Sequence, residues 1–245
     1  MNKIKKTKVN LFIPCFVDQL FPDTAFNMVK VLEKAGCEVH YNGNQTCCGQ
    51  PAFNAGFWDE AQSVARKFIK DFSDYNYVVS PSGSCVGFVR NFYTELFDNT
   101  SVHNDCKQLQ KNTYEFTEFM VNVLKITDVG AEFNHRVTYH DACGALRECK
   151  VKTSPRELLS KVKGLELTEM KESETCCGFG GTFAVKFADI SGAMATQKSE
   201  NALATEAEYI VSTDTSCLMH IDGWLKKHQK PIKTMHIADV LAQGW

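Results

Sequence analysis

Four residues, Thr46-Cys-Cys-Gly49, recur later in the chain as Thr175-Cys-Cys-Gly178. Three further blocks recur around them in the same order, pairing residues 9–15 with 137–143, 77–85 with 209–217, and 116–120 with 237–241. The offsets along the chain are 128, 129, 132 and 121 residues, a drift that loop insertions would produce. The chain is therefore predicted to be a tandem duplication, with one copy at residues 1–128 and the other at residues 129–245.

Each copy has the pattern of strands that alternate with helices. Strands are expected at residues 9–14, 37–41 and 75–80, and at 137–140, 165–170 and 209–212. Helices are expected at residues 23–35 and 61–72, and again from Ser154, as N-cap, with Pro155 in the first turn, and at 183–194. This alternation predicts an α/β fold of two tandem repeats, each a small, mainly parallel sheet flanked by helices, with the repeats related by a pseudo-two-fold axis.

The charge balance narrows the classes of partner. Lys and Arg number 27 against 29 Asp and Glu, so the net charge is −2 and neither nucleic acid nor an anionic membrane is expected as the main partner. The apolar stretch at residues 9–17 is too short for a signal peptide, and no run has the length of a transmembrane segment. A cytoplasmic protein is expected, in which thiols stay reduced and cysteines bind metal or react.

Eight of the 11 cysteines form two matched sets of four. The first set is Cys15, Cys47, Cys48 and Cys85, and the second is Cys143, Cys176, Cys177 and Cys217. Four cysteines end or follow predicted strands, at the sheet edge where such folds bind ligands. Four thiolates there form a soft site that suits an iron–sulfur cluster, zinc or copper(I). Adjacent cysteines reach one ion poorly but can bind two irons of one cluster, so the pattern favours iron and sulfide.

Other residues belong to the same hypothesis. The glycines beside the paired cysteines are expected to bring backbone N–H groups close to a cluster, and they are Gly49, Gly178, Gly180 and Gly181. His140 and Asp141 precede Cys143 and either tune the cluster or simply alternate along a buried strand. The three cysteines outside the sets, Cys37, Cys106 and Cys149, are expected to be buried core residues.

The motifs resemble the duplicated cysteine-rich domain known as CCG, and within that group the chain is most similar to the lactate-utilisation protein A family. The supporting strings are Ile13-Pro-Cys15, residues 46–57, Pro81-Ser-Gly-Ser-Cys85, Tyr139-His-Asp-Ala-Cys143 and Cys176-Cys-Gly-Phe-Gly-Gly-Thr-Phe183. The resemblance implies an iron–sulfur electron-transfer subunit that takes part in oxidising L-lactate to pyruvate, with another 2-hydroxy acid left open as the substrate. It also implies two partners, a ferredoxin-like iron–sulfur subunit and a third small subunit.

One departure from the related CCG-containing subunit of heterodisulfide reductase concerns the ligand number. That protein has a further cysteine three residues after the last one, where this chain has Phe88 and His220. Each copy therefore offers four thiolates, enough for an ordinary [4Fe–4S] cluster, and one or two clusters are expected in total. His220 is a candidate fifth ligand, or else a solvent-facing residue of a helix.

Two other functions remain open from the residues alone. The sets of four cysteines would also suit a zinc-binding scaffold without a redox role. The paired cysteines would also suit a thiol–disulfide reductase of the heterodisulfide reductase type. Residues that would act directly on a substrate are not identified by the sequence.

Overall fold

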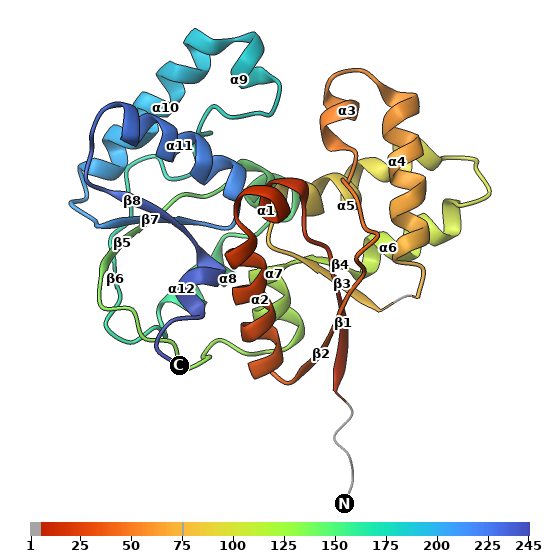
Figure 1. Ribbon diagram of the computed structural model, residues 1–245, viewed down its shortest axis with the longest axis horizontal. Coiled ribbons are helices and arrows are strands. Elements are labelled where there is room, and N and C mark those ends of the chain that lie inside the picture. The colour runs from red at the N-terminus through yellow and green to blue at the C-terminus, as the bar shows by residue number, and fades with distance from the viewer. Residues whose placement is uncertain (1–5, 75) are drawn as a thin grey trace, which may run out of the picture.

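The computed structural model describes residues 6–74 and 76–245, and Figure 1 shows two α/β halves side by side. The first sheet has the order β2-β1-β3-β4, with β1 at Thr7–Leu11, β2 at Cys37–Tyr41, β3 at Tyr77–Ser80 and β4 at Thr113–Glu115. The second has the order β6-β5-β7-β8, with β5 at Arg136–Tyr139, β6 at Glu166–Leu167, β7 at Tyr209–Ser212 and β8 at Lys233–His236. Every neighbouring pair is parallel. The predicted α/β tandem repeat is confirmed.

Most helices of the two halves also correspond. The first half contains α1 (Cys15–Leu20), α2 (Pro22–Lys34), α3 (Gln50–Asn54), α4 (Trp58–Asp71), α5 (Gly83–Phe97), α6 (His103–Asn112) and α7 (Phe116–Glu118), which continues as the π-helix η1 (Phe119–Val123). The second half contains the π-helix η2 (Gly144–Glu148), α8 (Thr153–Leu159), α9 (Phe183–Lys186), α10 (Ala188–Leu203), α11 (Thr215–Lys227) and α12 (Ile237–Leu241). Within the described residues, no helix has both the length and the apolar character needed to cross a bilayer.

Three predicted details were wrong. The strand expected at residues 165–170 is reduced to Glu166–Leu167, because only these two residues pair with β5. Helix α8 begins at Thr153, so Ser154 is buried in its first turn and is not the N-cap. The single helix expected at residues 183–194 is broken at Phe187 into α9 and α10, and Phe187 and Ile190, which keep its period, are more than half exposed. Tyr75, at the start of a predicted strand, lies outside the described residues.

The packing between the halves is reciprocal. Helix α12 packs on α2, and its counterpart α7 packs on α8. Helix α5 packs on η2, and its counterpart α11 packs on α1. Ser82 and Asp214, which occupy equivalent positions of the two copies, form an antiparallel bridge with each other. Such contacts between equivalent elements are what a two-fold axis between two copies produces.

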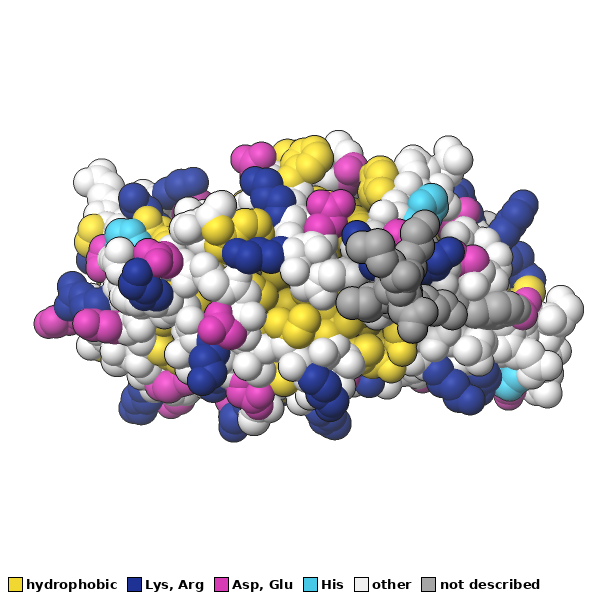
Figure 2. Space-filling model, turned by 90° about the horizontal axis from the view of Figure 1, so that it is seen from below, with side chains coloured by type: hydrophobic (Ala, Val, Ile, Leu, Met, Phe, Trp, Pro, Cys, Tyr) yellow, Lys and Arg dark blue, Asp and Glu magenta, His cyan; other side chains and the backbone are white. Residues whose placement is uncertain are grey.

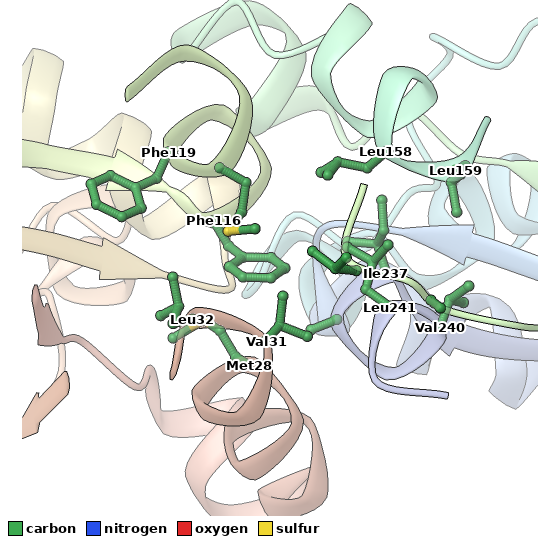
Figure 3. Close-up of a cluster of buried hydrophobic side chains, with 14 of the residues drawn as sticks. Met28, Val31, Leu32, Phe116, Phe119, Leu158, Leu159, Ile237, Val240 and Leu241 are labelled. Carbon is green, nitrogen blue, oxygen red and sulfur yellow. The ribbon is translucent and has the colours of Figure 1, made fainter. Parts of the chain in front are cut away.

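A shared hydrophobic core joins the two halves. Figure 3 shows α2 contributing Met28, Val31 and Leu32 opposite side chains of α12 that include Ile237 and Leu241. Asp239 of α12 adds hydrogen bonds of 2.9 Å from both Thr24 and Asn27 of α2. Figure 2 shows the lower face of the molecule, where apolar side chains gather in the middle and charges of both signs surround them. The shared core fixes the two halves against each other and so fixes the site between them.

Candidate metal centre

All eight cysteines of the two predicted sets line one cavity of about 340 Å³. In Figure 1 the segments that carry them meet in the upper middle, between the α3–α4 arm and the α9–α10 arm. The cysteines come from the starts of α1, α5 and α11, from the residue before η2, and from the turns that precede α3 and α9. The parallel sheets deliver these segments to one edge, as the sequence predicted, and the two-fold packing merges the two edges into one cavity.

Within each set the four thiols are in contact in the same order. In the first set hydrogen bonds link Cys15 to Cys47, Cys47 to Cys48, and Cys48 to Cys85. In the second set they link Cys143 to Cys176, Cys176 to Cys177, and Cys177 to Cys217. In each half, segments that are more than 30 residues apart in sequence thus bring four sulfur atoms together.

These contacts shift the pKa values of the thiols within each set in opposite directions. The hydrogen bond from Cys15 lowers the pKa of Cys47 to about 2, and the hydrogen bond from Cys143 lowers the pKa of Cys176 to about 2. The same bonds raise the pKa values of Cys15 and Cys143. Each set therefore contains one sulfur that readily becomes a thiolate, the form that binds metal.

The glycine of each Cys-Cys-Gly turn has a geometric role. Gly49 and Gly178 have φ values of +94° and +95°, which L side chains rarely adopt. In this conformation the Gly49 N–H donates to the Cys47 sulfur at 3.3 Å, and the Gly178 N–H donates to the Cys176 sulfur at 3.4 Å. Gly180 and Gly181 also line the cavity. The backbone therefore helps to stabilise negative charge on the same sulfur in each half.

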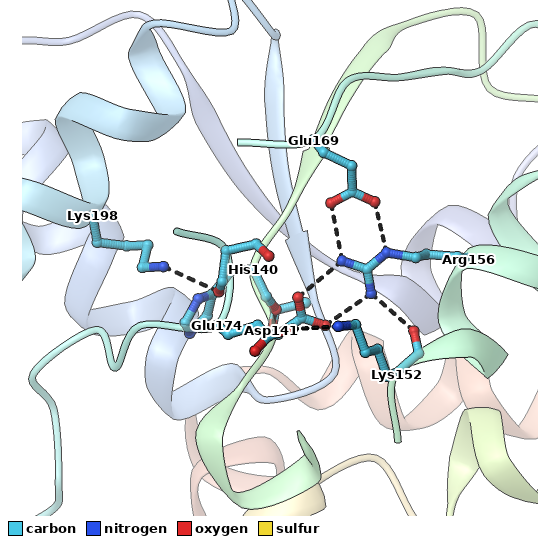
Figure 4. Close-up of polar contacts among 9 residues, drawn as sticks. His140, Asp141, Lys152, Arg156, Glu169, Glu174 and Lys198 are labelled. Atoms are coloured by element: carbon cyan, nitrogen blue, oxygen red, sulfur yellow. Dashed lines mark hydrogen bonds and ion pairs between the residues drawn. The ribbon is translucent and has the colours of Figure 1, made fainter. Parts of the chain in front are cut away.

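The second set lies beside a polar network that Figure 4 shows around His140. The carboxylate of Asp141 accepts two hydrogen bonds of 2.8 Å from Arg156, which also pairs with Glu169. Burial raises the pKa of Asp141, but the Arg156 hydrogen bonds and charge outweigh burial and hold the pKa below its usual value. The Lys198 ammonium, almost fully buried, donates to the carbonyl oxygens of Glu172 and Ser173 at 2.5 and 3.1 Å.

His140 is the residue whose importance the sequence understated. Its ring is fully buried, and one ring nitrogen and the sulfur atoms of Cys177 and Cys217 lie within 4.8 Å of one another. Burial and the nearby Lys198 charge lower the pKa of His140 to about 4, so the ring is neutral. The sequence feature that could have pointed to His140 is its position, one residue beyond strand β5 and three residues before Cys143.

The remaining predicted residues are placed as follows. His220 does not join the group of His140, Cys177 and Cys217, and its Nε2 lies 3.2 Å from the Ser191 hydroxyl, so its role as a ligand stays a prediction. Cys37, Cys106 and Cys149 are buried away from the cavity lining, as expected.

Comparison with known proteins shows similarity to one domain family and to relatives that share one name. The family model described as CCG, cysteine-rich domain, matches residues 9–90 and 137–222. The chain is 43% identical to "Lactate utilization protein A" of Oceanobacillus iheyensis and 44% identical to the protein of the same name from Halalkalibacterium halodurans, in both cases over 96% of each chain. It is 40% identical to "Lactate utilization protein A 2" of Bacillus cereus over 97% of this chain and 98% of the relative.

Among solved structures, the fold is similar to that of a hypothetical protein from Helicobacter pylori, with a TM-score of 0.58 at 12% identity. The match covers 98% of this chain and 50% of the other, so this chain spans half the length of that protein. At this identity the likeness concerns the fold alone.

Proposed function

Because this chain belongs to the CCG cysteine-rich domain family, with lactate utilization protein A homologues that match it almost end to end, we propose that it is an iron–sulfur electron-transfer subunit in the oxidation of L-lactate to pyruvate. Each set of cysteines could hold one [4Fe–4S] cluster, so the chain would bind one or two clusters. The lactate assignment rests on the names of the relatives.

The observation that carries the proposal is the repeated contact among four thiols at the edge of each sheet. A [4Fe–4S] cluster takes four cysteine thiolates and supplies a one-electron redox centre. In this chain Cys47 and Cys176 are the sulfurs most ready to lose a proton, and Gly49 and Gly178 donate to them. Each set supplies four cysteine sulfurs and a positioned backbone N–H, so the residues fit the group.

The cavity also indicates where electrons would enter or leave. Cys15 is exposed, whereas Cys48, Cys177 and Cys217 are buried. Both sets open on one cavity, so a partner that docks over it would approach both at once. The partners we propose are a ferredoxin-like iron–sulfur subunit and a third small subunit of a lactate-oxidising system.

A genetic experiment tests the lactate assignment. A strain that lacks this protein should fail to grow on L-lactate and grow normally on glucose. The wild-type gene should restore growth, whereas the Cys47→Ser and Cys176→Ser genes should not. Cys106→Ser, a matched change at a cysteine outside the cavity, should restore growth. Normal growth of the deletion strain on L-lactate would remove the assignment.

A further inference from the structure

The two sulfur sites have equivalent geometry but different surroundings. Repeat alignment pairs Phe12 with His140 and Phe88 with His220. Gly49 lies against the backbone of Ala61, and Gly178 lies in the same way against the backbone of Ser191. This superposes α4 on α10, so that Phe68 corresponds to Lys198. Three phenylalanines around the first site are therefore replaced by two histidines and a lysine around the second.

The first site is apolar behind its sulfurs. Phe12 and Phe68 pack edge to face with ring centroids 4.7 Å apart, and both belong to one buried cluster with Cys48 and Phe88. None of these rings can donate a lone pair to a metal. A group bound in the first site would therefore have cysteine sulfur alone on this side.

The second site has a nitrogen donor in the place of the Phe12 ring. Both ring nitrogens of His140 are buried and lack a hydrogen-bond partner among the described residues. The Ser173 carbonyl lies near the ring, but it already accepts hydrogen bonds from Lys198 and from the backbone N–H of Asp141. Buried polar atoms are nearly always paired, so an orphan imidazole beside two cysteine sulfurs calls for a missing partner.

We infer that His140 is a nitrogen ligand of the metal group that the second half holds, beside Cys177 and Cys217. Ligand atoms bound to one ion at about 2.0–2.3 Å lie roughly 3–4.5 Å apart, and these three atoms all lie within 4.8 Å of one another. The inference rests on the proposed function in that the sulfur sites bind metal. It adds that the two sites are chemically distinct, one with sulfur donors only and one with sulfur and imidazole.

Cobalt(II) is a suitable probe because it replaces zinc or iron in such sites, and its visible spectrum reports the donors. The reduced, metal-free full-length protein would be titrated with Co²⁺ in the absence of oxygen. The wild type should bind it with thiolate charge-transfer bands and two distinguishable ligand-field spectra. His140→Phe, which copies the first half, should lose one spectrum and weaken Co²⁺ binding at one site at least about tenfold. The surface change His228→Phe is the matched control and should have no effect.

Two checks keep the inference open to refutation. Far-UV circular dichroism establishes that His140→Phe is folded, and His140→Asn, a smaller polar substitution, should show the same loss. Wild-type spectra in both His140 variants would overturn the inference and leave the proposed metal sites intact. Loss of the second spectrum in His220→Phe, with none in the His140 variants, would overturn it in favour of His220. A wild type that binds no Co²⁺ through thiolates would instead remove the proposed function.

Discussion

Replacing Gly178 by alanine tests whether the Cys-Cys-Gly turn is held by backbone geometry. At φ +95° a side chain is strained, at a cost of about 1–2 kcal/mol. The added Cβ would also lie 2.7 Å from the Ser191 carbonyl oxygen and 2.9 Å from the Met194 Cβ, and overpacking of this kind costs about 1–3 kcal/mol. The free energy of unfolding should therefore fall by about 2–5 kcal/mol, a large part of the stability of an ordinary protein.

The assay is urea unfolding of the reduced, metal-free protein, followed by circular dichroism. Gly192→Ala is the matched control, because its Cβ would meet nothing within 4 Å and alanine favours the α10 helix. The control should be neutral or more stable by up to about 1 kcal/mol. Iron incorporation should also fall in Gly178→Ala, since a strained turn would move the backbone N–H of residue 178 away from the Cys176 sulfur. A Gly178→Ala protein within about 0.5 kcal/mol of the wild type and with full iron content would refute the reasoning.

Other substitutions test the scaffold around the site. Burial raises the pKa of Glu115 from 4.5 to about 7, so the folded state holds a proton that the unfolded chain loses, and stability should fall by about 3 kcal/mol as pH rises through this interval. Glu115→Gln should flatten the dependence in urea melts at several pH values, and an unchanged slope would exclude Glu115 as its source. Asp141→Asn should lower the free energy of unfolding by about 2–4 kcal/mol, because it removes the buried charge that pairs with Arg156. Glu169→Gln, on the exposed side of the same arginine, should lower it by less than about 1 kcal/mol, and equal losses in the two variants would contradict this ranking. Gly144→Ala, whose Cβ would lie 2.6 Å from a backbone carbon of the opposite half, should cost about 1–3 kcal/mol in the same melts, and a neutral result would show that the halves can separate.

Much of the architecture follows from the repeat. Strands β2 and β7 lie where the sequence placed them, because short β-rich runs bounded by turn residues have few alternatives. The grouping of the eight cysteines also followed, because parallel strands deliver what comes after them to one edge. The sequence did not predict that both sets of cysteines line one cavity. It depends on the packing of α5 on η2, where Gly83 would clash with Ala145 if it carried a side chain.

The error in the region of α10 has a clear physical origin. The buried face of α10 is formed by Ser191, Ala195 and Lys198, whereas the apolar Ile190 is exposed. Hydrophobic periodicity cannot identify a buried face whose members are small or charged. Lys198 is tolerated there because the carbonyl oxygens of Glu172 and Ser173 accept hydrogen bonds from its ammonium group. The deviation from the ordinary pattern therefore occurs next to the candidate site, where such deviations are expected.

The most direct measurement is the iron and acid-labile sulfide content of the protein purified without oxygen. We expect equal amounts of iron and sulfide, about four of each for every occupied set of cysteines. One occupied set should be lost when Cys47 or Cys176 is changed to serine, and none when Cys106 is changed. Stoichiometric zinc without sulfide, or a metal-free protein that exchanges disulfides through its paired cysteines, would contradict the assignment of these thiols to iron.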